Sequence, residues 1–163
     1  MVIKYLPALF TFLIISFDTD GFEDVDFSSN EPYFSGQITK KHLFKTNDIF
    51  LENYENYSVE ENLLTNNPDF RILILFGLWC HDSKREVPKM LKILDSIGLG
   101  NEKLQLVAVD IEKNDPENLS KSFNLKRTPT FIIFKDLNEI GRIVERPNES
   151  IEKDLLNIIE QKN

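Results

Sequence analysis

The chain has 163 residues, of which 41% are hydrophobic and 28% are charged, and its formal net charge is −8. This size and composition predict one globular domain with extensions. The acidic balance argues against nucleic acid or anionic lipid as the main partner, because both bind basic surfaces. The single cysteine excludes an internal disulfide and a zinc site built from several cysteines.

At the N-terminus, one lysine precedes an apolar run from Leu6 to Phe17. The run is too short to span a bilayer comfortably, and it has the length of the hydrophobic region of a signal peptide. Residues 1–20 are therefore predicted to be a signal peptide, and the protein is predicted to be exported, either to the periplasm or as a secreted protein, without a stable membrane span. The alternative is that this run forms a first core strand or helix.

Residues 21–45 are interpreted as an acidic linker and an N-terminal extension. The stretch from 18 to 32 contains six acidic residues and no basic one, which is typical of a solvated, loosely held segment. Between residues 33 and 67, short apolar clusters at helical spacing indicate helices, and Pro68 ends the region.

From Arg71 onward the apolar patterns predict regular structure. Short continuous apolar runs indicate strands buried on both faces, and apolar residues at helical spacing after Cys80 indicate an amphipathic helix. The strands are predicted at 71–76, 104–110, 130–134 and 140–145, and helices are predicted from about residues 80, 116 and 148. This order predicts an α/β fold in which helices flank a mixed sheet, with parallel strands joined by a crossover helix and then an antiparallel hairpin.

Three motifs point to one family. "WCHDS", residues 79–83, lies at the junction of the first predicted strand and its helix, and Pro88 follows eight residues after the cysteine. "RTPT", residues 127–130, precedes a buried strand. Together they resemble the thioredoxin family over about residues 46–161, so residues 46–163 are predicted to form a thioredoxin-like domain.

The resemblance implies a site. It implies that the Thr128–Pro129 peptide bond is cis and that Pro129 faces Cys80. Trp79, His81, Thr128 and Pro129 are then the predicted substrate-binding residues.

The cysteine carries the predicted chemistry. Cys80 is expected at a helix N-terminus, where unpaired N–H groups and the helix dipole stabilise a thiolate. A positive charge on His81 would add to this effect, and the Asp82 carboxylate would oppose it. The alternative is a buried cysteine that behaves as a small hydrophobic side chain.

Ser83 stands where the family has its second cysteine. A serine hydroxyl cannot resolve a mixed disulfide, so exchange through one thiol is predicted. Cys80 and Ser83 are the candidate catalytic residues, with Ser83 expected to donate a hydrogen bond to the thiolate. The mixed disulfide would be released by a thiol of the substrate, which is isomerisation, or by glutathione or another small thiol.

Two further positions depart from the family pattern. Ile74 stands where the family commonly has a buried acid, and Ala108 stands where a lysine often accompanies it. This favours a slower or binding role. The predicted function is therefore monothiol exchange with protein or peptide thiols and disulfides. The alternatives are a redox-inactive module that holds an extended peptide between Cys80 and Pro129, and a thiol-dependent peroxide or glutathione reaction.

No cofactor is predicted, and no metal site. Cys80, His81 and Asp82 are consecutive, so their side chains point in different directions on a helix and do not converge on one ion.

Overall fold

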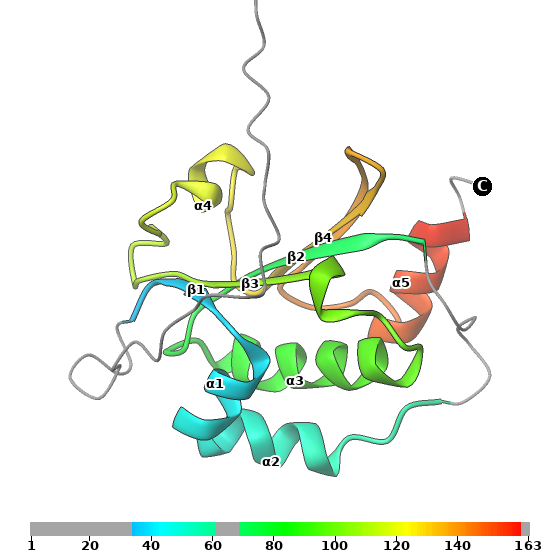
Figure 1. The fold of residues 1–163 in the computed structure, drawn as a ribbon, viewed down its shortest axis with the longest axis horizontal. Helices are drawn as coiled ribbons and strands as arrows, with labels where there is room; N and C mark the ends of the chain where they lie inside the picture. Colours follow the sequence, from blue (N-terminus) through cyan, green and yellow to red (C-terminus); the bar gives the residue numbers. More distant parts are fainter. Residues whose placement is uncertain (1–33, 61–68, 161–163) are drawn as a thin grey trace, which may run out of the picture.

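The computed structural model describes residues 34–60 and 69–160, which form a five-stranded sheet with helices on both faces (Figure 1). In their order across the sheet, the strands are β1 (Gly36–Ile38), β3 (Leu104–Ala108), β2 (Arg71–Phe76), β4 (Thr130–Lys135) and β5 (Asn138–Val144). The predicted mixed α/β sheet flanked by helices is confirmed. The predicted signal peptide at 1–20, and the predicted linker up to residue 33, lie outside the described residues.

Strand pairing brings the two halves of the predicted site together. β2 is parallel to β3, and the crossover between them is supplied by α3 (His81–Ser96). β2 is antiparallel to β4, with Leu75 opposite Thr130. The end of β2, which leads to Cys80, therefore lies beside the start of β4, which follows Pro129.

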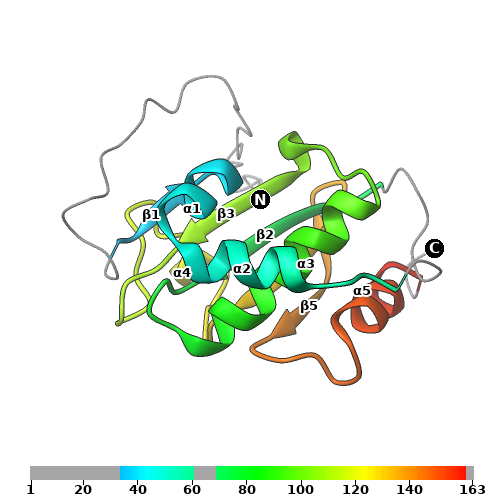
Figure 2. The same cartoon turned by 90° about the horizontal axis from the view of Figure 1, so that it is seen from below.

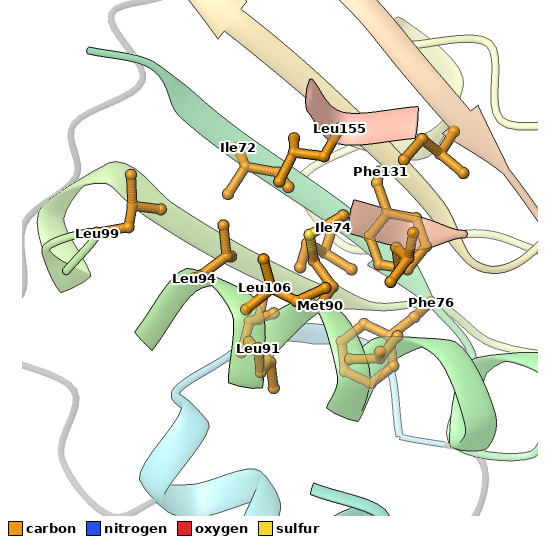
Figure 3. Close-up of a cluster of buried hydrophobic side chains, with 14 of the residues drawn as sticks. Ile72, Ile74, Phe76, Met90, Leu91, Leu94, Leu99, Leu106, Phe131 and Leu155 are labelled. Carbon is orange, nitrogen blue, oxygen red and sulfur yellow. The ribbon is translucent and has the colours of Figure 1, made fainter. Parts of the chain in front are cut away.

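The side chains of β2 alternate between two cores because successive residues of a strand point to opposite faces. Ile72, Ile74 and Phe76 face α3 and α5 (Ile151–Glu160), where they pack against Met90, Leu91, Leu94 and Leu155 (Figure 3). Leu73 and Leu75 face the other way, toward Leu119 of α4 (Leu119–Ser122). Burial on both faces explains why β2 reads as a continuous apolar run.

The remaining helices cover α3. α1 (Lys40–Thr46) leads directly into α2 (Asp48–Asn56), and α2 packs along the outer side of α3 (Figure 2). α3 ends at the predicted glycine: Gly98 has a φ of +71°, and the Leu99 N–H donates to the Leu94 carbonyl. The left-handed backbone at Gly98 thereby provides a hydrogen bond for the Leu94 carbonyl, which would otherwise have no partner within the helix. A 3-10 turn, η1 (Asn101–Lys103), then enters β3.

Some sequence predictions were wrong in detail. Residues 36–38, predicted as part of a helical region, form β1, which pairs antiparallel with β3 and extends the sheet. Three residues are too few for a periodicity to show. α4 begins later than residue 116 because the Asp115 carboxylate accepts from the N–H groups of Leu119 and Ser120.

Candidate active site around Cys80

Cys80 is the residue that caps the N-terminus of α3. Its backbone is extended (φ −82°, ψ 125°), its N–H donates to the Gly77 carbonyl at 3.0 Å, and its carbonyl accepts the N–H of Lys84 at 3.1 Å. The side chain is partly exposed and the thiol is free. The predicted position at the positive end of a helix dipole is therefore the one the structure has.

The thiol meets the loop before β4. Cys80 Sγ lies 3.2 Å from the carbonyl oxygen of Thr128, in the geometry of an S–H donor. The Thr128–Pro129 peptide bond is cis, the isomer expected from the sequence. Both loop residues are buried, and the Pro129 carbonyl accepts the N–H of Glu145 at 2.7 Å. The thiol thus faces a fixed stretch of backbone rather than a mobile loop.

The Trp79 indole lies against Gly77, the residue that follows β2. A Cβ added at Gly77 would lie 2.6 Å from Cε2 and 2.8 Å from Nε1 of the indole, so only glycine leaves the ring this close to the backbone. Nε1–H donates to the carbonyl of Val109 at 3.1 Å. These contacts fix the ring, half exposed, beside Cys80, where it is available as a surface for a bound chain.

Ser83 is fully buried, and its hydroxyl accepts the backbone N–H of Gly77 at 3.2 Å. The expected hydrogen bond from Ser83 to the Cys80 sulfur is not among the contacts of the described residues. The bond from Gly77 uses the Ser83 hydroxyl as an acceptor. Ser83 therefore holds the junction of β2 and α3 together, and a direct role in catalysis stays a prediction.

His81 and Asp82, the next two residues, differ in exposure. The His81 side chain is 86% exposed and lies at the rim, with its Nδ1 3.9 Å from Oδ1 of Asp82. The Asp82 carboxylate is 15% exposed and forms ion pairs with Arg85 at 2.7 Å and Arg146 at 3.2 Å. Burial alone would raise the pKa of Asp82, but the hydrogen bond from Arg146 and the charges of Arg146 and Arg85 hold it below its usual value. The two guanidiniums thereby offset the negative charge that the sequence predicted would oppose a thiolate.

The core behind Cys80 is apolar at the two positions that depart from the family. Ile74 and Ala108 are fully buried, and their cross-strand neighbours are Leu106 and Phe76. No carboxylate or ammonium occupies these positions to take up or supply a proton.

A curated thioredoxin is similar in sequence to part of this chain. The chain is 32% identical over 69 residues to a curated thioredoxin from Echinococcus granulosus, a match that covers 42% of this chain and 59% of the relative. The chain thus matches about three fifths of that relative's length. No protein-family model matches the chain.

The chain is thioredoxin-like, with one cysteine. Among solved structures, it is similar to thioredoxin from Fasciola hepatica, with 21% identity, a TM-score of 0.41 and coverage of 58% of this chain and 81% of that one. It is also similar to mitochondrial thioredoxin 3 from Saccharomyces cerevisiae, with 18% identity, a TM-score of 0.40 and coverage of 73% and 89%.

Several residues of this thioredoxin-like site could not be found from the sequence. Two of them contact Trp79 through the backbone: Gly77 by its lack of a side chain and Val109 by its carbonyl. The third, Arg146, forms an ion pair with a distant segment. No sequence motif marks any of the three. Within residues 34–60 and 69–160, no group of three or more His, Cys, Asp or Glu side chains is arranged to hold a metal. None of the helices in those ranges has both the length and the apolar character needed to cross a membrane.

Proposed function

We propose that this protein carries out thiol–disulfide exchange through the single thiol of Cys80, with protein or peptide disulfides as substrates. The observation that carries the proposal is the placement of a partly exposed thiol at the N-terminus of α3, 3.2 Å from the Thr128 carbonyl and beside the indole of Trp79. The fold class and the curated thioredoxin relative support this general kind of chemistry.

The proposed reaction uses one sulfur atom of the protein, that of Cys80. The Cys80 thiolate attacks one sulfur of a substrate disulfide, a new S–S bond forms, and the second substrate sulfur leaves as a thiolate with the electron pair of the broken bond. Another thiolate of the substrate then attacks the substrate sulfur of the mixed disulfide and returns Cys80 as a thiolate. The substrate disulfide has moved, and no net electrons are transferred. An external small thiol such as glutathione in the second step would instead leave a new mixed disulfide on the substrate.

The apolar core supports a slow rather than a fast cycle. Because Ile74 and Ala108 carry no ionisable group, protons for the leaving thiolate come from solvent or from the substrate. Ser83 contributes no resolving thiol.

The test is insulin reduction by dithiothreitol with the wild type, Ser83→Cys and Cys80→Ala. Ser83→Cys restores two thiols one turn apart and is expected to be clearly faster than the other two, with the wild type close to Cys80→Ala. Efficient reduction by the wild type, with no gain from Ser83→Cys, would show that serine does not block resolution.

A second function has its own support. The Cys80 thiol is positioned to donate a hydrogen bond to the Thr128 carbonyl. A thiolate cannot make this bond, so the contact favours the neutral thiol over the nucleophilic form. It therefore supports a groove that binds an extended chain by backbone hydrogen bonds without turnover. If no variant differed from the dithiothreitol control in the insulin assay, this binding role would be the better account.

Export is proposed on the apolar run from Leu6 to Phe17 and the acidic stretch that follows it. Intact mass of the protein recovered from its own compartment tests this. Loss of a segment ending near residue 20 is expected, and a full-length cytosolic product would contradict it.

A further inference from the structure

The rim of the Cys80 site on the side of Thr128 is basic, in a chain whose net charge is −8. Lys126 and Arg127 directly precede Thr128, and both are exposed. Arg146, from the segment that follows β5, reaches across to Asp82 at the start of α3. The first turns of α3 carry one further cation of the rim, Arg85, which pairs with the same Asp82 carboxylate.

The acids that pair with these cations are the less exposed partners, and Arg127 and Arg146 are the most exposed guanidiniums, whereas Arg85 is 34% exposed and also donates to the buried Glu86 at 2.5 Å. Arg146 and Arg85 share the Asp82 carboxylate, which is 15% exposed, whereas the Arg146 side chain is 65% exposed. Arg127 pairs with Glu145 at 2.5 Å and is itself 66% exposed, against 31% for Glu145. Each guanidinium has five N–H donors, so its outward edge retains donors for a further acceptor.

The loop on the other side of the site is weakly acidic, because Asp110 and Glu112 outnumber its one cation, Lys113. Asp110 and Glu112 follow Val109, whose carbonyl holds the Trp79 indole. Glu112 is exposed. The Asp110 carboxylate accepts hydrogen bonds from the backbone N–H groups of Glu112 and Asn114. The site is therefore polarised, with the cations on the flank formed by Thr128, Glu145 and the first turn of α3.

We propose that the basic rim formed by Arg85, Lys126, Arg127 and Arg146 selects acidic partners: an extended polypeptide segment with Asp or Glu close to the residue that lies over Cys80. The proposal rests on the proposed function in so far as a polypeptide occupies the groove. A polypeptide fits better than a small anion because the cations come from three separate segments on either side of the Cys80–Thr128 contact. Arginine is suited to this task, since its planar fork binds carboxylates with two parallel hydrogen bonds.

The dependence of affinity on salt distinguishes attraction by the nearby rim from repulsion by the net charge of the whole chain. The Debye length is about 8 Å at physiological ionic strength, so the nearby rim acts on a bound carboxylate more strongly than the distant acids do. Added salt is therefore expected to weaken binding of an acidic peptide. Repulsion from an overall negative protein would produce the opposite trend.

Trp79 provides the readout because it is the one tryptophan of the chain and lies beside Cys80. The full chain carrying Cys80→Ser, which cannot exchange, is titrated with three peptides that lack cysteine and tryptophan and differ only in having Glu, Gln or Lys at the same positions. The Glu peptide is expected to bind about tenfold more tightly than the Gln peptide at low salt, as two or three exposed ion pairs would give. Arg127→Gln and Arg146→Gln should each weaken binding of the Glu peptide and leave the Gln peptide unchanged, and Arg127→Lys should restore part of the loss.

The matched control is Lys135→Gln, which removes the same charge at the far end of β4 from Pro129 and should change neither titration. Equal affinity for the Glu and Gln peptides, or tighter binding of the Lys peptide, would overturn the acidic preference. No response to any peptide would overturn it too, since the groove would then hold no polypeptide. The exchange reaction is checked separately by the rate at which wild-type Cys80 forms an adduct with a neutral small disulfide, so failure of the charge preference is distinguishable from failure of the proposed chemistry.

Discussion

Gly77→Ala is predicted to destabilise the protein through Trp79 alone. The new methyl carbon would lie 2.6 Å from Cε2, 2.8 Å from Nε1 and 2.9 Å from Cζ2 of the indole. Carbon atoms in contact prefer separations of about 3.5–4.0 Å, so the ring must move by roughly 1 Å. The shift strains or breaks the 3.1 Å hydrogen bond from Nε1 to the Val109 carbonyl.

The magnitude follows from three opposing contributions. Overpacking costs about 1–3 kcal/mol, and loss of the indole hydrogen bond costs about 0.5–1.5 kcal/mol. Replacing glycine by alanine stabilises by about 0.4–1 kcal/mol through the unfolded chain where the backbone permits it. The expected net loss in free energy of unfolding is about 0.5–4 kcal/mol.

Urea denaturation followed by far-UV circular dichroism measures this loss without relying on Trp79 fluorescence. The decisive control is the same substitution in a Trp79→Ala background, where no indole opposes the methyl group. There Gly77→Ala should be neutral or stabilising by up to about 1 kcal/mol. An equal cost in both backgrounds would refute the reasoning, because the clash would then lie elsewhere.

Two further predictions concern stability. Ser83→Ala removes the buried acceptor of the Gly77 N–H and should cost about 1–3 kcal/mol in urea denaturation, whereas Ser96→Ala, at the exposed end of the same helix, should stay within about 0.5 kcal/mol; similar costs for both would remove the junction role of Ser83. Burial, together with the hydrogen bond to Asp95 and its charge, raises the pKa of Tyr54 from 10.0 to about 12. Because the folded state keeps this proton longer than the unfolded state, the contribution of Tyr54 is complete below pH 10 and is lost as the pH rises toward 12. Tyr54→Phe should therefore flatten the fall of stability across that window, and identical slopes for the two proteins would contradict the assignment.

Local patterns predicted most of the fold because they have local causes. The double burial of β2 left a continuous apolar run, and Gly98 marked the end of α3 through its left-handed backbone. β1 was missed because its three residues join the sheet through pairing with β3, which lies almost 70 residues later in the chain and leaves no local signal.

The candidate site was predicted in part for the same reason. The motifs located Cys80 and Pro129, and strand pairing then brought them together. The structural role of Ser83, which accepts the Gly77 N–H, was not predicted, because the sequence does not show which backbone groups a buried hydroxyl meets. The ion pair that offsets the charge of Asp82 could not be predicted from local sequence either, because Arg146 lies 64 residues away along the chain.

If Cys80 carries out exchange, the fold must make its thiol more reactive toward disulfides than an ordinary cysteine thiol. The most direct measurement is the rate at which Cys80 forms a mixed disulfide with a neutral small disulfide at neutral pH, followed by intact mass, for the folded protein and for the same chain unfolded in urea. A single cysteine makes the unfolded chain its own reference for an ordinary thiol. Faster adduct formation is expected in the folded protein, with release of the adduct by an added thiol. A folded-state rate at or below that of the unfolded chain would contradict it.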